Sequence, residues 1–286
     1  VKLARDAFPV TREFAYLDTA SVGPVSTTYA ETLASCTETD IRHGRARMAR
    51  FDRIDTARQR LRDEIAMLLG ASADEFELTQ GTTDSIGTLL AAYPWRDGDE
   101  IVSTKVEYPA CTDALVAAAT RTGLKLVSAE VPEHGADDLG WLERCLTPRT
   151  RLIAFSGVAY TTGQRLPIEA IVDLATERGI HTLVDGAQLV GAGPLDLAAT
   201  GIDFLAMPMQ KWLCGPEGLG ALYVRHGTIE KLPRPKNATH GWPVLEAAAR
   251  HLGWMRETLG WDWILTRTQQ LNRYAQASIR DSGTHT

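Results

Sequence analysis

The stretch DFLAMPMQKWLCGPEGLGALYVR, residues 203–225, decides how this chain folds. Its two apolar runs, 203–208 and 220–225, are typical of buried strands, and a turn rich in glycine and proline separates them. Lys211 lies in that turn with uncharged neighbours on both sides. Because long charged side chains are rarely buried without a partner or a task, Lys211 either extends to water or lies in a dry site where its amine can react.

Strand-like and helix-like segments alternate along the chain from about residue 50. The spacing of apolar residues predicts helices at 56–70, 82–93, 111–123 and 168–179. Strands are expected at 75–81, 99–106, 124–131, 151–158, 181–187, 203–208 and 220–225. Since these strands read as nearly continuous apolar runs, they predict an α/β fold whose mostly parallel sheet is covered by helices on both faces. Residues 244–279 are helical in pattern and no strand follows, which indicates the start of a second, smaller domain.

The composition excludes several classes of protein. The chain has 286 residues, of which 44% are hydrophobic and 23% charged, and its net charge of −6 offers no basic field for nucleic acid. No apolar run is long enough to cross a bilayer and the first residues do not resemble a signal peptide, so we expect a cytoplasmic protein without a membrane partner. The four cysteines are widely scattered, which argues against a zinc site or a disulfide framework.

In open α/β sheets, ligands bind at the carboxyl ends of the strands, and a candidate site lies in LTQGTTDS, 78–85. There a strand ends at Gly81, and Thr82 and Thr83 begin a helix. Free backbone N–H groups, the positive end of the helix and the hydroxyls favour phosphate binding. An ordinary helix cap explains the same residues, so both interpretations stay open.

Two more strand ends carry unusual residues, in VEYPA, 106–110, and in LVDGAQ, 183–188. Asp185 ends a strand, where a carboxylate is costly without a cation, and Gln188 is near enough to contact a second ligand atom. Tyr108 follows a strand and is able to stack its ring on a flat ligand. A helix cap at Asp185 and core packing of Tyr108 are the alternatives.

Together these residues match the requirements of pyridoxal 5'-phosphate (PLP). Lys211 would form the Schiff base, and Asp185 would keep the pyridine nitrogen protonated so that the ring accepts electrons. A Schiff-base lysine must lose its proton before it attacks, which a dry site favours.

The segments LTQGTTDSIG, VEYPA, VAYTTGQRLPI, TLVDGAQLVG and MQKWLCGPEGLGALYV, in this order, resemble the class V aminotransferases, a family of fold-type I PLP enzymes. The resemblance extends to cysteine lyases, cysteine desulfurases and isopenicillin N epimerase-like members, and covers about residues 14–275. It implies a large cofactor-binding domain at 15–230. It also implies a small α+β domain, incompletely represented, to which 1–14 and 231–286 contribute.

The resemblance also implies roles for single residues. Lys211 matches the Schiff-base lysine, Asp185 the partner of the pyridine nitrogen, and Gln188 the residue that contacts the ring hydroxyl. Thr82 and Thr83 match ligands of the cofactor phosphate.

Three further positions complete the implied site. Tyr108 stands where desulfurases place a stacking histidine, and Gln210 where many relatives have a histidine close to the phosphate. Thr239 resembles a threonine that reaches the phosphate from the neighbouring subunit, which implies a homodimer with shared active sites.

The sequence departs from the family pattern in several places. Gly157, not histidine, follows Ser156, and Pro208 stands where desulfurases place a phosphate-binding serine. The arginine that binds the substrate carboxylate and the reactive cysteine loop of desulfurases both belong to the incompletely represented domain. Arg47 and Arg165 are weaker candidates for that arginine, and structural roles explain them equally well.

Several reactions of an amino-acid substrate fit these residues. In each, the substrate amine displaces Lys211, and the freed lysine removes the Cα proton. Cys111 and Cys214 do not fall where the family places its sulfur acceptor, so we expect β-elimination from a cysteine-derived substrate by a C–S lyase. Amino transfer and epimerisation are the alternatives, as is a degenerate scaffold without catalysis. A nicotinamide dehydrogenase is disfavoured because no GxGxxG follows an early strand.

Overall fold

The computed structural model describes residues 1–46, 48–133, 136, 138–228 and 240–282. In these residues a seven-stranded sheet has the strand order β1-β7-β6-β5-β4-β2-β3. The strands are β1 (Phe76–Thr79), β2 (Glu100–Thr104), β3 (Lys125–Ala129), β4 (Thr150–Ser156), β5 (His181–Asp185), β6 (Phe204–Pro208) and β7 (Gly220–Val224).

Most neighbouring strands of this sheet are parallel. Strands β3, β2, β4, β5 and β6 pair in parallel, whereas β7 is antiparallel to both β6 and β1. Strand β7 runs antiparallel to β6 because the glycine-rich connection between them is short. Parallel neighbours need a longer crossover connection. The predicted α/β fold with a mostly parallel sheet is therefore confirmed.

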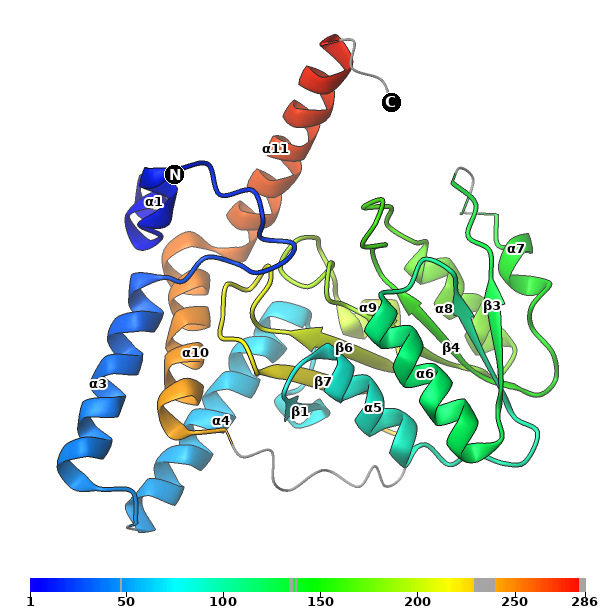
Figure 1. Cartoon of the computed structure of the whole chain (residues 1–286), viewed down its shortest axis with the longest axis horizontal. Coiled ribbons are helices and arrows are strands. Elements are labelled where there is room, and N and C mark those ends of the chain that lie inside the picture. Colours follow the sequence, from blue (N-terminus) through cyan, green and yellow to red (C-terminus); the bar gives the residue numbers. More distant parts are fainter. Residues whose placement is uncertain (47, 134–135, 137, 229–239, 283–286) are drawn as a thin grey trace.

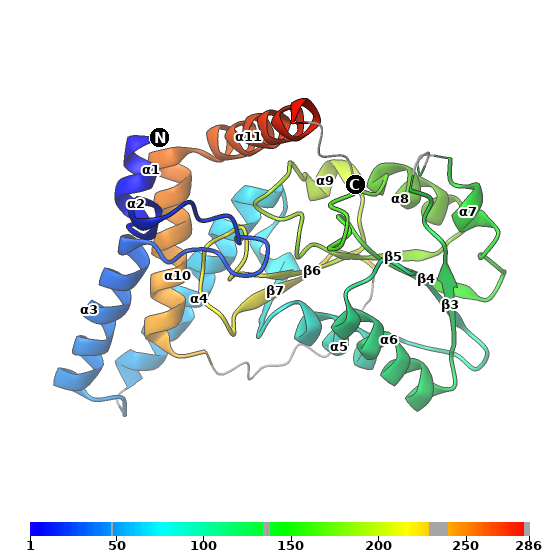
Figure 2. The same cartoon turned by 45° about the horizontal axis from the view of Figure 1, so that its top comes forward.

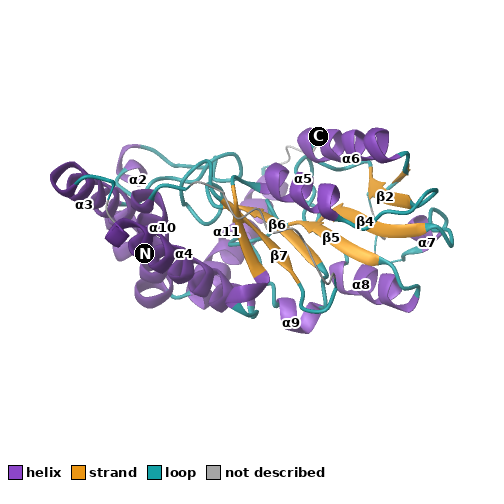
Figure 3. Ribbon diagram, turned by 90° about the horizontal axis from the view of Figure 1, so that it is seen from below, coloured by secondary structure: helices purple, strands orange, loops and turns teal. Residues whose placement is uncertain are grey.

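Helices cover both faces of the sheet, as its apolar strands require (Figure 3). Within the described chain the helices are α1 (Lys2–Ala7), α2 (Val10–Glu13), α3 (Thr27–His43), α4 (Met48–Leu69), α5 (Thr82–Ala92), α6 (Pro109–Thr122), α7 (Gly140–Glu143), α8 (Ile168–Glu177), α9 (Leu197–Thr200), α10 (Trp242–Trp254) and α11 (Trp261–Asp281). A 3₁₀ turn, η1 (Ala73–Glu75), precedes β1, and a π-helical turn, η2 (Met255–Leu259), joins α10 to α11.

The alternation of side chains along each strand separates two cores. Ile101 of β2 and Leu183 of β5 pack with α5 and α6, while their neighbours Val102 and Val184 pack on the opposite face with α4 and α8. All five residues of β2 and of β6 are buried. The strands therefore carry apolar residues at consecutive positions because both faces of the sheet are covered.

The C-terminal segment, which is helical in pattern over 244–279, forms two helices with a turn between them. Helix α10 packs against α3 and α4 and adds Leu245 and Leu252 to the core of the sheet (Figure 1). The π-helical turn and Gly260, with φ 78°, then redirect the chain. Helix α11 extends away from the body of the protein and has no buried residue (Figure 1).

The expected second domain stays a prediction. Residues 240–282 contain helices and no strand, so the part of the chain that the structure describes does not test its α+β character. None of the described helices has the length and apolar character that a membrane span needs.

The N-terminal segment brings one more element to the sheet. After α2 it crosses from the helical side of the molecule to the carboxyl ends of the strands, and then returns to α3 (Figure 2). There the backbone N–H of Gly23 donates to the carbonyl oxygen of Gln210 at 2.6 Å. The edge of the sheet that carries the predicted ligand residues is thus covered by a strap, residues 18–23, from the start of the chain.

Candidate active site

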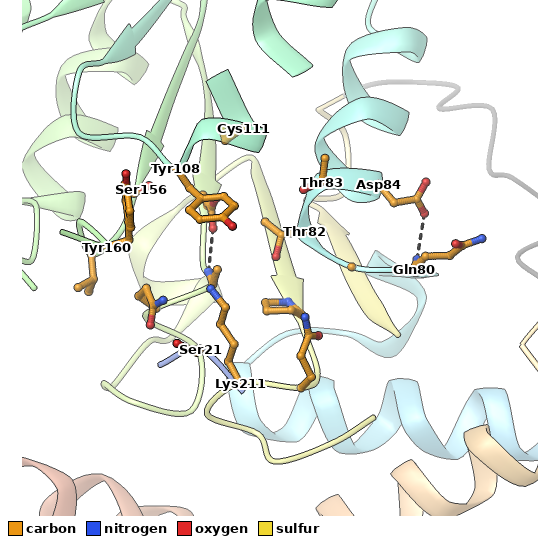
Figure 4. A pocket seen from close by; sticks show the side chains of 17 residues that line it. Ser21, Gln80, Thr82, Thr83, Asp84, Tyr108, Cys111, Ser156, Tyr160 and Lys211 are labelled. Carbon is orange, nitrogen blue, oxygen red and sulfur yellow. Dashed lines mark hydrogen bonds between the residues drawn. The ribbon is translucent and has the colours of Figure 1, made fainter. Parts of the chain in front are cut away.

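A cavity of about 420 Å³ lies at the carboxyl ends of β4, β5 and β6, beside the start of α5 (Figure 4). Seven predicted site residues line it: Thr82, Thr83, Tyr108, Asp185, Gln188, Gln210 and Lys211. The eighth, Thr239, lies outside the described residues. Residues that are far apart in the sequence are therefore brought together at one place.

Lys211 and Asp185 form the charged pair of this cavity. Asp185, at the end of β5, is only 6% exposed, and its Oδ1 accepts a hydrogen bond from the backbone N–H of Ala187 at 2.8 Å. Burial raises the pKa of Asp185, while that hydrogen bond and the positive charge of Lys211 oppose the rise. Burial likewise lowers the pKa of Lys211, and the carboxylate of Asp185 opposes this fall. The cavity thus favours a neutral amine on Lys211.

A tight turn holds Lys211 in place. The backbone N–H of Cys214 donates to the carbonyl oxygen of Lys211 at 2.9 Å, and that of Gly215 donates to Met209 at 2.8 Å. The strap packs directly on this turn, since a Cβ on Gly23 would lie 2.2 Å from the carbonyl oxygen of Lys211. Only glycine therefore fits at that position of the strap.

The start of α5 has the features of a phosphate site. Gly81 is the N-cap residue, and no side chain caps the helix, so the ordinary cap that the sequence left open is not formed. The hydroxyl oxygen of Thr82 and the amide oxygen of Gln210 are buried without a hydrogen-bond partner among the described residues. Because helix N-termini leave N–H groups unpaired, this end of the cavity is suited to an anion.

The backbone of β7 packs closely on the backbone at Gly81, where α5 begins. A Cβ on Gly220, the first residue of β7, would lie 2.6 Å from the Cα of Gly81. Pro208, which replaces the expected serine, lines the cavity beside this contact. Pro208 offers no hydroxyl at this end of the cavity, where Thr82 and Thr83 carry the hydroxyl groups.

Tyr108 and Gln188 lie nearer to the lysine. Tyr108 is 49% exposed, so core packing does not explain it, and its ring centroid lies 5.7 Å from the Nζ of Lys211. The Oε1 of Gln188 accepts from the Nε1 of Trp212 at 2.9 Å, and its Nε2 donates to the carbonyl oxygen of Ala20 at 3.0 Å. An amide nitrogen carries two hydrogens, so one donor of Gln188 remains for a ligand.

Sequence reasoning missed three residues that line the cavity, namely Ser21, Ser156 and Tyr160, and also Glu107, which lies behind Ser156 and binds it. The buried carboxylate of Glu107 accepts from the hydroxyl of Thr104 at 2.5 Å and from the backbone N–H and hydroxyl of Ser156 at 2.9 and 2.7 Å. Burial raises the pKa of Glu107, and these hydrogen bonds oppose the rise. Glu107 lies beside Tyr108 in VEYPA, and Tyr160 lies in VAYTTGQRLPI, so both were inside segments that resemble the family, whereas Ser21 had no such signal.

The cysteines near the site are not activated. Cys111 lines the cavity, but burial raises the pKa of its thiol, as do the negative charges of Asp185 and Glu107. Burial raises the pKa of Cys214 to about 12. Both thiols are thus protonated near neutral pH, which agrees with the expectation that neither accepts sulfur.

Arg165, one of the two weaker arginine candidates, does not line the cavity. The guanidinium of Arg165 donates to the carbonyl oxygen of Pro194 at 3.3 Å and lies 3.6 Å from the carboxylate of Glu169. Arg47 lies outside the described residues. Among the described residues that line the cavity, Lys211 is the one cation. In the same part of the chain, no group of His, Cys, Asp or Glu side chains is arranged to hold a metal ion.

Comparison with known proteins agrees with this geometry. Residues 21–258 match the family model of class V aminotransferases, and the chain belongs to this family. It is 34% identical over 194 residues to a probable cysteine desulfurase of Mycolicibacterium paratuberculosis, covering 66% of this chain and 28% of that protein. It is 33% identical over 178 residues to the hercynylcysteine sulfoxide lyase of Schizosaccharomyces pombe, covering 60% and 45%.

Solved structures of similar fold include C-S lyases and desulfurases. A variant of C-DES with glycine covalently linked to its PLP cofactor superposes with a TM-score of 0.83 at 25% identity, covering 88% of this chain and 74% of that one. The apo cysteine desulfurase of Thermococcus onnurineus has a TM-score of 0.82 at 22% identity, covering 98% and 76%. The chain spans less than half the length of the first curated relatives that it matches, with 28%, 46% and 42% covered.

Proposed function

We propose that this protein is a PLP-dependent C–S lyase that performs β-elimination on a cysteine-derived amino acid. The observation that carries the proposal is the pairing of Lys211 with the buried Asp185 in one cavity of a class V aminotransferase fold. Each charge opposes the pKa shift that burial causes in the other group. A Schiff-base lysine and a pyridine-nitrogen partner need such an environment.

The residues of the cavity fit PLP. The phosphate would be held by Thr82, Thr83 and Gln210. The hydroxyl oxygen of Thr82 and the amide oxygen of Gln210 are buried without a described partner, and no side chain caps the start of α5. Gln188 has one amide hydrogen left for the ring hydroxyl, and Tyr108 presents its ring beside Lys211. When bound, PLP supplies an electron-accepting ring that stabilises negative charge on the substrate Cα.

The protein's own groups would move the protons. The Nζ of Lys211, with its lowered pKa, takes the proton from Cα. Asp185 holds the proton on the pyridine nitrogen, because a buried carboxylate gains most from an adjacent cation. Tyr108 covers one side of this region and keeps water from the reacting carbon.

The state of the thiols favours elimination over sulfur transfer to the protein. Cys111 and Cys214 hold their protons near neutral pH, so neither is a thiolate that attacks the substrate sulfur. The similarity to probable cysteine desulfurases favours a second candidate, cysteine desulfurase, whose sulfur acceptor would lie outside the described cavity.

The products distinguish the candidate reactions. Purified protein with PLP is incubated with L-cysteine and L-cystine, and the products are identified by mass spectrometry and chiral chromatography. A C–S lyase releases pyruvate and ammonia, whereas a desulfurase releases alanine. An aminotransferase releases the 2-oxo acid only with an amino acceptor, and an epimerase the D-isomer. Alanine, the D-isomer, or a 2-oxo acid formed only with an amino acceptor contradicts the proposal.

The protein is also proposed to act as a cytoplasmic homodimer with shared active sites. The resemblance of Thr239 to a phosphate ligand from the neighbouring subunit supports this, and the four free cysteines are consistent with a reducing compartment. Mixing Lys211→Ala and Thr239→Ala proteins tests the sharing, because a mixed dimer then regains one intact site. No regain of activity after subunit exchange contradicts it.

A further inference from the structure

Two tyrosines stand half-exposed at the mouth of the cavity. Tyr160 is 44% exposed and Tyr108 is 49% exposed, and their ring centroids lie 5.2 Å apart at an interplanar angle of 86° (Figure 4). Both line the cavity that contains Lys211. Large aromatic side chains that keep this much surface in water beside a cavity indicate a contact surface for a ligand.

A short hairpin holds Tyr160 rigidly. Val158 and Arg165 form an antiparallel bridge, and the backbone N–H of Ala159 donates to the carbonyl oxygen of Gln164 at 2.9 Å. The side chain of Gln164 donates to the carbonyl oxygen of Pro132 at 3.1 Å, which anchors the hairpin to the connection after β3. The backbone at Tyr160 is thus already ordered before a ligand binds. Binding therefore costs little free energy for ordering this segment.

The charges around the cavity determine which ligand suits these rings. The described charged residues that line it are Asp84, Asp185 and Lys211, and no arginine or histidine is among them. The hairpin directs its own cation, Arg165, away from the cavity toward Pro194 and Glu169. An anionic substituent at the mouth would therefore meet no cation from the hairpin, while an aromatic ring would meet the two phenol rings.

We propose that Tyr160 is a specificity-determining residue that selects substrates whose sulfur carries an aromatic ring without an anionic group. This inference rests on the proposed C–S lyase function. In the reaction Lys211 takes the Cα proton, and the Cβ–S bond breaks with its electron pair on sulfur, which leaves as the thiolate of the aromatic group. The remaining dehydroamino acid takes up water and gives pyruvate and ammonia. Tyr160 contacts the departing ring and takes no part in proton transfer.

Three thioethers of cysteine test this selection in the PLP-loaded protein. S-benzyl-L-cysteine, S-methyl-L-cysteine and S-carboxymethyl-L-cysteine differ in the group on sulfur, and kcat/KM is measured from pyruvate release. We expect the wild type to prefer the benzyl over the methyl and carboxymethyl substrates. Tyr160→Ala should lower kcat/KM about fivefold for the benzyl substrate, chiefly through KM, because an aromatic pair is worth about 1 kcal/mol. Turnover of S-methyl-L-cysteine should change less than about twofold on the same estimate.

Two variants are the controls. Tyr160→Phe keeps the ring and should keep the preference, and Tyr274→Ala removes a tyrosine that is 73% exposed on α11, away from the cavity. An equal loss for all three substrates in Tyr160→Ala, or an unchanged preference, overturns the proposal. If no thioether is cleaved, the C–S lyase function fails instead. Titration calorimetry of S-benzyl-L-cysteine with wild-type and Tyr160→Ala protein then tests the contact by itself, and equal affinities overturn it.

Discussion

The Nζ of Lys211 lies 5.7 Å from the centroid of the Tyr108 ring. The negative charge of Asp185, at the end of β5, raises the pKa of Lys211 against the effect of burial. The amine is thus placed between an aromatic face and a buried acid. A flat cofactor with a protonated ring nitrogen occupies such an arrangement favourably, because each of its parts meets a complementary group.

Replacement of Lys211 should remove the proposed chemistry while leaving the fold intact. Lys211→Ala should lower pyruvate release by roughly 10³-fold or more, because both the Schiff-base amine and the proton acceptor are lost. Borohydride reduction of the wild type with PLP, followed by peptide mapping, should label Lys211. Lys105, whose side chain is 57% exposed, is the matched control, and Lys105→Ala should keep both label and activity. A label on another lysine would falsify the assignment.

The pH dependence of Schiff-base formation should report on Asp185. The pKa of Lys211 is lowered by burial and raised in part by Asp185, so removing that negative charge lowers it further. In Asp185→Asn the pH profile of borohydride trapping should therefore move to lower pH than in the wild type. Catalysis should fall by about 10²- to 10⁴-fold, because the ring nitrogen loses the carboxylate that keeps it protonated. A profile that moves to higher pH contradicts this electrostatic account.

A methyl group on Gly23 should disturb the lysine turn. The added Cβ would lie 2.2 Å from the carbonyl oxygen of Lys211, so the strap or the turn must move. Gly23→Ala should lower the free energy of unfolding by about 1–3 kcal/mol and weaken PLP binding, as overpacking does. Gly87, in α5, has no heavy atom within 4 Å of a built Cβ, and Gly87→Ala serves as the control. Chemical denaturation and PLP titration measure both effects, and equal results for the two variants contradict the prediction.

A buried histidine should make the protein less stable in acid. His251 hydrogen-bonds to the hydroxyl of Ser26 at 2.8 Å and to the carbonyl oxygen of Leu213 at 2.9 Å, beside the lysine turn. Burial lowers its pKa to about 4, whereas the unfolded chain binds the proton near pH 6.5.

The unfolded state therefore holds more protons than the folded state between these two values. The stability is fully present above pH 6.5 and should fall by about 1.4 kcal/mol per pH unit as the pH drops toward 4. Urea denaturation at a series of pH values measures this slope. In His251→Asn that contribution should vanish, and a slope equal to that of the wild type means that other groups cause the acid loss.

Much of the site was predictable because its signals are local. Asp185 ends an apolar strand, Thr82 and Thr83 follow a glycine at a helix start, and Lys211 interrupts two buried runs. Each of these patterns depends on neighbours in the sequence. Their assembly into one cavity follows from the parallel sheet, which brings the carboxyl ends of its strands to the same edge.

Other parts of the site left no such signal. Ser21 lines the cavity because the strap crosses the molecule, and Tyr160 lies there because a hairpin is anchored at Pro132. The requirement for glycine at residue 23 comes from its contact with Lys211, far away in the sequence. These features depend on which distant segments meet, and residue patterns do not report that.

The sequence by itself thus determined the α/β class and the mostly parallel sheet, because burial periodicity and turn chemistry depend on consecutive residues. Together with the family resemblance it also identified seven of the residues that line the cavity. The tertiary structure alone decided the strap over Lys211, the aromatic mouth at Tyr160, and the packing of α10 on α3 and α4. The reason is physical: close packing of distant surfaces selects one arrangement among many that satisfy the same local preferences.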